Sequence, residues 1–99
     1  MNVMLLKSGV DISRLNREIR RSLPVVAKIL RAHDFELVIT ETFAGVHGEG
    51  SLHYSNDAYD MRNPSRDLDE IVIEIEGELG DDFDVVSERT HIHIEYDPD

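Results

Sequence analysis

The sequence predicts an α+β domain in which a small antiparallel sheet carries N-terminal helices and one further helix on one face. Three patterns support this: apolar residues recur at helical spacing in the first third, a β-branched stretch follows, and the C-terminal end alternates strictly. The 99 residues include no cysteine, which excludes disulfides and thiolate metal sites. At this length folding buries roughly two-thirds of the unfolded surface, enough for one core. We therefore expect a single domain over residues 1–99.

The N-terminal part, residues 11–33, is predicted to be helical. One helix face is formed by its apolar positions Leu15, Ile19, Leu23, Val26, Ile29 and Leu30. Pro24 suits the first position of a helix, and Ser22 lies close enough to cap it. We therefore expect two consecutive helical pieces rather than one straight helix. His33, beside Asp34, is expected to end the second piece.

The second part, residues 35–98, is predicted to combine strands with a long loop and one helix. Residues 35–42 are rich in β-branched side chains and predict a strand. Residues 43–56 carry three glycines and predict a long loop, of the kind that is usually functional in a small domain. Residues 58–62 are expected to return as a short strand.

The following segment fits two secondary structures. Ile71, Ile73 and Ile75 alternate as in a strand, whereas the same segment also presents a helical face. We predict a helix, because acidic residues crowd its N-terminal end and Gly80 marks a suitable stop, although Gly77 counts against it.

The C-terminal end predicts two strands, residues 83–87 and 91–96, joined around residues 88–90. In the last strand one face is apolar and the other is polar. Ile92, Ile94 and Tyr96 share the first, and His91, His93 and Glu95 share the second. We expect the apolar face to pack in the core and the polar face to carry the chemistry.

The chain is strongly acidic, with 10 basic and 21 acidic residues and a formal charge of −11. Such a surface repels polyanions and argues against nucleic acid as a partner. The first apolar run, residues 3–6, is too short for a signal peptide or a membrane span, so we expect a soluble protein without an export signal or a membrane partner. The charge fits either a halophilic protein, whose self-repulsion salt screens, or an ordinary acidic cytoplasmic protein.

Four of the five histidines form two clusters, each with nearby carboxylates: His47 with His53, and His91 with His93. Core packing does not require two histidines on the polar face of one strand. The clustering therefore points to a metal or catalytic site.

Residues 51–60 carry a spaced motif: Ser51, His53, Ala58 and Asp60, with six residues between the histidine and the aspartate. This resembles the first motif, Ser-x-His followed by Gly-x-Ala-x-Asp, of the zinc D-Ala-D-Ala carboxypeptidase and endopeptidase family, peptidase family M15. Asn56 replaces the glycine of that motif. Because asparagine tolerates left-handed backbone geometry, we expect it to keep the same turn.

A second motif follows downstream, where Glu88 stands three residues before His91, as the general base precedes the third metal ligand in this family. Residues 50–54, 83–86 and 91–96 also resemble small phage-encoded members, which share Gly-Ser-Leu-His-Tyr, Phe-Asp-Val-Val and His-x-His-x-Glu-Tyr stretches. The resemblance covers residues 35–98 and implies the hedgehog/DD-peptidase fold.

The resemblance implies a Zn²⁺ site with His53, Asp60 and His91 as ligands and Glu88 as the catalytic base. Three N and O ligands leave a fourth position on zinc for water, whose pKa falls to about 7. His93 has three open roles: it orients a ligand, contacts the substrate or replaces His91.

Three further residues belong to the predicted surroundings of the metal. Ser51 is part of the first motif. Arg62 and Arg89 bind a substrate carboxylate or stabilise an oxyanion on one interpretation, and form surface ion pairs on the other.

The implied function is a zinc metallopeptidase of virus or prophage type that hydrolyses murein stem peptides, as a D,D-carboxypeptidase, endopeptidase or endolysin. It would act in the host cytoplasm before lysis or on the virion. The alternative is a structural or interaction protein of a virion, including that of a haloarchaeal virus, whose metal braces the fold or a contact with other virion proteins. In a haloarchaeal setting murein is absent, and a surface-layer protein would replace it as substrate.

Overall fold

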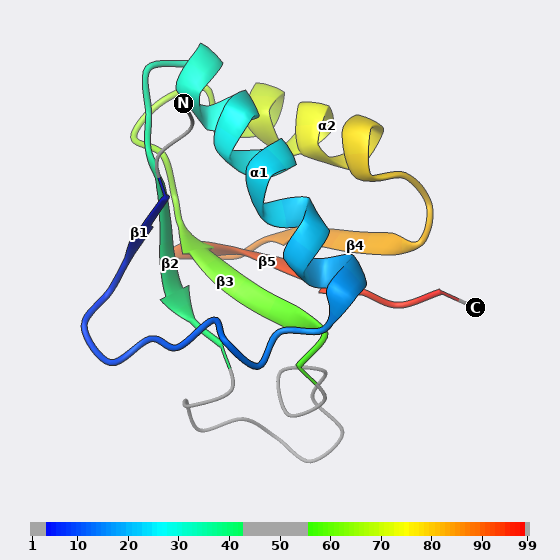
Figure 1. Ribbon diagram of the computed structural model, residues 1–99. Helices are drawn as coiled ribbons and strands as arrows, with labels where there is room; N and C mark the ends of the chain where they lie inside the picture. Colours follow the sequence, from blue (N-terminus) through cyan, green and yellow to red (C-terminus); the bar gives the residue numbers. More distant parts are fainter. Residues whose placement is uncertain (1–3, 43–55, 99) are drawn as a thin grey trace.

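The computed structural model describes residues 4–42 and 56–98. The elements in chain order are β1 (Met4–Leu6), α1 (Arg17–Ala32), β2 (Leu37–Glu41), β3 (Ala58–Arg62), α2 (Leu68–Leu79), β4 (Phe83–Ser87) and β5 (His91–Tyr96). The strands form one five-stranded sheet in the order β1-β2-β3-β5-β4 (Figure 1). The predicted α+β class is confirmed, and so are the strands that became β3, β4 and β5.

The sheet is mixed, so the predicted antiparallel sheet is wrong at one edge. β1 pairs parallel with β2, while the other pairs are antiparallel. Parallel neighbours need a crossover connection, and α1 provides it between β1 and β2. β1 was not predicted, because a strand of three residues is too short to show an alternation.

α1 is one helix that contains Pro24, so the predicted break into two pieces is also wrong. Proline removes a helical hydrogen bond, but Pro24 itself is exposed, while Leu23, Val26 and Ala27 beside it are buried. Burial of this apolar face therefore keeps the helix continuous through the proline.

The prediction that Ser22 caps a helix is wrong. The Ser22 hydroxyl donates to the Ile19 carbonyl at 2.6 Å, and the Tyr59 hydroxyl lies 3.0 Å from the Ser22 Oγ. Since the only hydroxyl proton of Ser22 is used on Ile19, Tyr59 is the donor in the second bond. This buried pair joins α1 to the middle of β3.

α2 confirms the helix chosen for the ambiguous segment. Ile71 and Ile75 are fully buried, whereas Ile73 between them is 67% exposed, as a helical period requires. The helix follows Asp67, whose φ is 61°, and ends before Gly80, whose φ is 84°. Both flanking residues thus adopt left-handed values of φ, which glycine accepts without strain.

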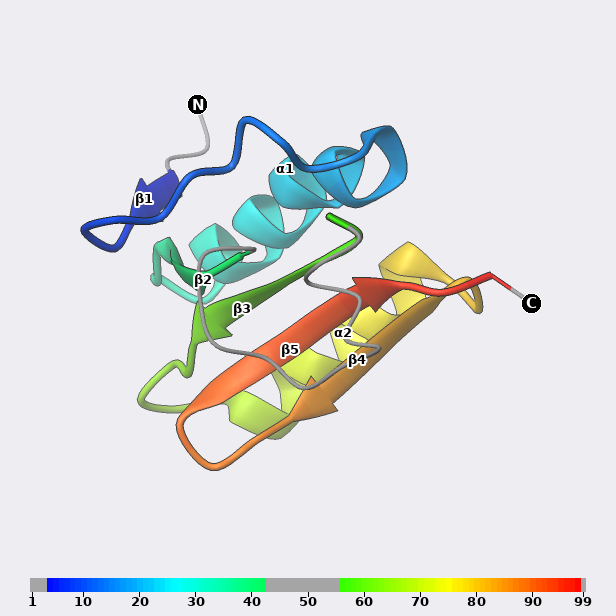
Figure 2. The same cartoon turned by 90° about the horizontal axis from the view of Figure 1, so that it is seen from below.

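Both helices pack on the same face of the sheet (Figure 1). Their buried apolar residues meet Tyr59 and Met61 of β3 and Ile92 and Ile94 of β5 in a single cluster. Seen from the other side, the sheet carries no described helix (Figure 2). Among the described residues, no helix is long and apolar enough to cross a membrane.

Candidate functional site

The sheet face turned away from the helices is called the site face below. β3 and β5 run antiparallel there, with Ala58 opposite Glu95, Asp60 opposite His93 and Arg62 opposite His91. Their alternating neighbours are buried on the helix side, so these residues share the site face. The predicted division of the last strand into an apolar and a polar face is confirmed.

Asp60 lies at the centre of this face, between two histidines. Its Oδ1 lies 2.8 Å from Nδ1 of His93, and its Oδ2 lies 3.6 Å from Nε2 of His91. The Asp60 side chain is only 8% exposed. A carboxylate so far removed from water needs a compensating positive group, which a protonated histidine or a cation supplies.

Both imidazoles are held at their second nitrogen as well. Nε2 of His93 lies 3.0 Å from Oε1 of Glu95, and Nδ1 of His91 lies 3.1 Å from the Thr90 hydroxyl. The result is a connected row of side chains, Glu95, His93, Asp60 and His91. The contact of Glu95 with His93 was not predicted, although Glu95 follows His93 by two residues and therefore lies on the same strand face.

The carboxylates of this row of side chains favour a positive charge on His93, which lies between Asp60 and Glu95. The hydrogen bond to Asp60 raises the pKa of His93 above its ordinary value, with smaller contributions from Glu95, while partial burial opposes the rise. The site therefore attracts protons when no other cation is bound, and a metal ion would compete with those protons.

The donor set fits zinc, which takes N and O ligands. Two ligands of one tetrahedral zinc lie roughly 3.4 Å apart, given bonds of about 2.1 Å. The 3.6 Å between Asp60 Oδ2 and His91 Nε2 is close to that spacing, whereas the 2.8 Å between Asp60 and His93 is an ordinary hydrogen-bond length. The geometry thus fits Asp60 and His91 as ligands, with His93 holding the other Asp60 oxygen.

Two predicted site residues, His53 and Ser51, lie outside the described residues, as does His47. Asn56 is described, and its φ of 62° confirms the left-handed backbone expected at the glycine position of the motif. Its carbonyl accepts a hydrogen bond from the Asn16 N–H at 2.9 Å. The turn that leads into β3 is therefore fixed to the start of α1.

Glu88 directly follows β4 and is exposed. Its backbone N–H donates to the His91 carbonyl at 2.8 Å, so it is the neighbour of His91 across the β4–β5 hairpin. The amide group of Asn63 donates to the carbonyls of Glu88 and Arg89, at 3.3 and 3.2 Å. Because both partners are acceptors, this amide has one allowed orientation. This contact of Asn63 was not predicted from the sequence.

The two predicted arginines stand at the same end of the site face. Arg62 is opposite His91, and Arg89 lies in the hairpin turn; both are exposed. Neither forms an ion pair with a described residue. Their guanidinium groups are accordingly accessible to an anionic ligand.

A register shift in β2 brings Glu41 opposite Asp60. Ile39 pairs with Met61, but Glu41 rather than Thr40 is the partner of Asp60. Such bulges occur next to active sites, where they redirect a side chain. No sequence pattern indicated this register shift, so the position of Glu41 was not predicted.

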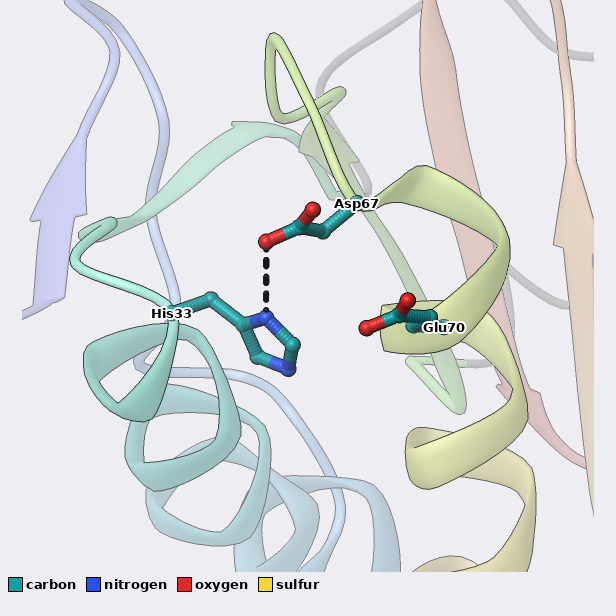
Figure 3. Close-up of side chains that lie close together, drawn as sticks. All are labelled: His33, Asp67 and Glu70. Atoms are coloured by element: carbon teal, nitrogen blue, oxygen red, sulfur yellow. Dashed lines mark hydrogen bonds and ion pairs between the residues drawn. The ribbon is translucent and has the colours of Figure 1, made fainter.

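A second group of charged side chains lies between the helices (Figure 3). His33, Asp67 and Glu70 each place a potential ligand atom within 4.8 Å of the others. His33 ends α1, as expected. Its two ring nitrogens contact Asp67 and Glu74 at hydrogen-bonding distances, so the imidazole already has partners at both nitrogens.

No protein-family model matches the chain, and no curated protein matches it. The peptidase family resemblance consequently stays a prediction from the motifs.

Proposed function

We propose that the protein is a zinc-dependent peptidase of viral or prophage type that cleaves the stem peptides of murein, as a D,D-carboxypeptidase or endopeptidase. The observation that carries the proposal is the nearly buried Asp60 carboxylate, with one oxygen at co-ligand spacing from His91 and the other bonded to His93. A carboxylate that is hydrogen-bonded to one imidazole and lies at co-ligand distance from a second is suited to bind a divalent metal ion.

In this proposal Asp60 and His91 hold the metal together with His53. Bound zinc would supply a water of lowered pKa and polarise the peptide carbonyl. His93 keeps Asp60 oriented, and Glu95 keeps His93 oriented. The row therefore orients the Asp60 carboxylate before any metal binds.

Glu88 is the proposed general base. Its carboxylate is exposed, and its backbone is bonded to His91 itself. It takes a proton from the attacking water and returns it to the leaving amine. Asn63 holds the turn that carries it, so the backbone of the base is fixed while its side chain stays accessible.

Arg62 is the proposed contact for a substrate carboxylate. It lies at the end of β3 and lines a surface hollow of about 470 Å³. The rest of that lining combines apolar side chains with one further cation and two carboxylates: Leu5, Phe35, Val38, Arg31, Asp34 and Glu36. A guanidinium beside small apolar surfaces suits the carboxylate end of a peptide with short side chains. Murein as the source of that peptide is supported by the motif resemblance.

The proposal is tested by Glu88→Gln, with Glu76→Gln on α2 as the matched control. Glu88→Gln should keep its zinc and lose hydrolysis of murein or stem peptides by at least about 100-fold, because the proton acceptor is gone. Glu76→Gln should retain both. Full hydrolysis by Glu88→Gln would contradict the assigned base.

A second candidate function is a virion component whose metal braces β3 against β5. The formal charge of −11 favours it, since a strongly acidic surface is repelled by an anionic wall. In that case zinc removal would lower the melting temperature, and neither the parent protein nor any variant would hydrolyse peptides. Hydrolysis that depends on Glu88 would exclude it.

A further inference from the structure

His33 joins the end of α1 to α2 through both of its ring nitrogens. Nδ1 lies 3.0 Å from Oδ2 of Asp67, and Nε2 contacts Oε2 of Glu74 (Figure 3 shows the first of these contacts). The Arg66 guanidinium also donates to the His33 backbone carbonyl at 3.2 Å. The His33 side chain is 15% exposed, whereas those of Asp67 and Glu74 are 37% and 49% exposed, so both bonds are open to solvent on the carboxylate side.

The hydrogen bonds of the His33 ring to Asp67 and Glu74 require a proton on each ring nitrogen. A carboxylate only accepts hydrogen bonds, and a neutral imidazole has one N–H and one lone pair. With a carboxylate at each nitrogen, both bonds exist together only in the imidazolium form. In the neutral form one nitrogen lone pair would face a carboxylate oxygen, and that contact is repulsive.

We propose that His33 is a proton-operated clamp that fastens α1 to the first two turns of α2 when protonated and releases one of these attachments when neutral. The clamp belongs to the helix layer and does not depend on the function proposed for the site face.

The charges around His33 favour the protonated form. Asp67, Glu70 and Glu74 face it from α2 and its N-terminal flank, and Asp34 follows it in the chain. Glu70 and Glu74 are one helical turn apart and repel each other unless a cation lies between them.

Two other cations are near but are used differently. Arg66 is committed to the His33 carbonyl and to the Phe35 ring, 4.7 Å from its centroid. Lys28 lines a hollow between the helices with Glu74 and Glu78. Only the imidazole of His33 bonds to Asp67 and Glu74 at once among the described residues.

The sign of the pH effect follows from these bonds. The hydrogen bond to Glu74, followed by that to Asp67, raises the pKa of His33 above its ordinary value, while desolvation opposes the rise. A raised pKa in the folded state means that the clamp contributes fully at acidic pH and is lost as the pH rises through that pKa.

The clamp also bears on the loop that connects β3 to α2. Arg66 and Asp67, which His33 holds, lie in the same short connection as Asn63, which supports the Glu88 turn. Release of the clamp should therefore loosen the first turn of α2 before it affects the rest of the fold.

The direct test is an NMR titration of the His33 ring in metal-free protein. We expect a pKa above 6.5 that falls in Glu74→Gln and stays unchanged in Glu76→Gln, a control on the same helix. A His33 pKa at or below 6.5, or one that Glu74→Gln leaves unmoved, would overturn the proposal.

A second test of the proposal measures how the free energy of unfolding depends on pH. The loss of unfolding free energy caused by His33→Gln should be largest near pH 5 and shrink toward about pH 9, because glutamine does not titrate. A loss that does not vary with pH would overturn the clamp. So would a zinc-induced shift of the His33 resonances at pH 8, since a metal ion rather than a proton would then be its partner.

Discussion

Asp60 shows at the scale of single residues how the fold makes a site from ordinary strand alternation. Its carboxylate is nearly buried, and the neighbouring strand supplies an imidazole to each of its oxygens. The grouping of Asp60 with His91 and His93 could be predicted, because the alternation of each strand is visible in the sequence. The hydrogen bonds of Asn63 and the register position of Glu41 could not be predicted, because the first depend on a hairpin packing against a loop and the second on a register shift.

The roles of the two histidines can be separated by substitution. His91→Ala should weaken zinc binding by more than about 100-fold, since it removes a ligand, whereas His93→Ala should weaken it by about 10- to 100-fold, since it removes the support of Asp60. Isothermal titration with zinc measures both. The reverse order would transfer the ligand role to His93 and contradict the assignment of His91.

α1 is the instructive case at the scale of secondary structure elements. Its apolar period predicted the buried face, but Pro24 and Ser22 suggested a break that is absent. Local propensity failed here because Leu23, Val26 and Ala27 are buried around the proline, and Ser22 is bound to Tyr59. β1 was not predicted because local sequence does not decide its structure either: its three residues become a strand only by pairing with β2.

Pro24 should therefore lower the free energy of unfolding without preventing the fold. Pro24→Ala restores a helical N–H opposite the Arg20 carbonyl, and we expect the free energy of unfolding to rise by about 2 kcal/mol after allowance for the more flexible unfolded chain. Denaturant unfolding measures this, with the exposed Arg21→Ala as a control that changes stability by less than about 0.5 kcal/mol. Destabilisation by Pro24→Ala would mean that the proline ring itself contributes to packing.

The whole molecule is dominated by its negative charge. The formal charge of −11 is spread over the chain, and α2 has acidic residues in its first turn and no basic residue in its last. Glutamates near the C-terminal end of a helix interact unfavourably with its dipole. Dilute buffer should therefore be an unfavourable medium for this fold.

Salt should stabilise the protein by screening this repulsion. The Debye length falls from about 10 Å at 0.1 M to about 3 Å at 1 M salt, so we expect the melting temperature to rise by at least about 5 °C over that range. The double variant Glu76→Gln and Asp81→Asn, which removes two exposed charges, should show a smaller rise. A melting temperature that does not change with salt concentration would contradict a halophilic origin.

Zinc content is the most direct test of the claim that Asp60 is the centre of a metal site. Protein purified without a histidine tag or chelator should contain about one zinc per chain by elemental analysis. Asp60→Asn, which keeps the shape and a hydrogen-bond acceptor for His93, should fold and contain none. Equal zinc in the two proteins, or none in the folded parent protein after zinc is added, would contradict the metal site and the peptidase built on it.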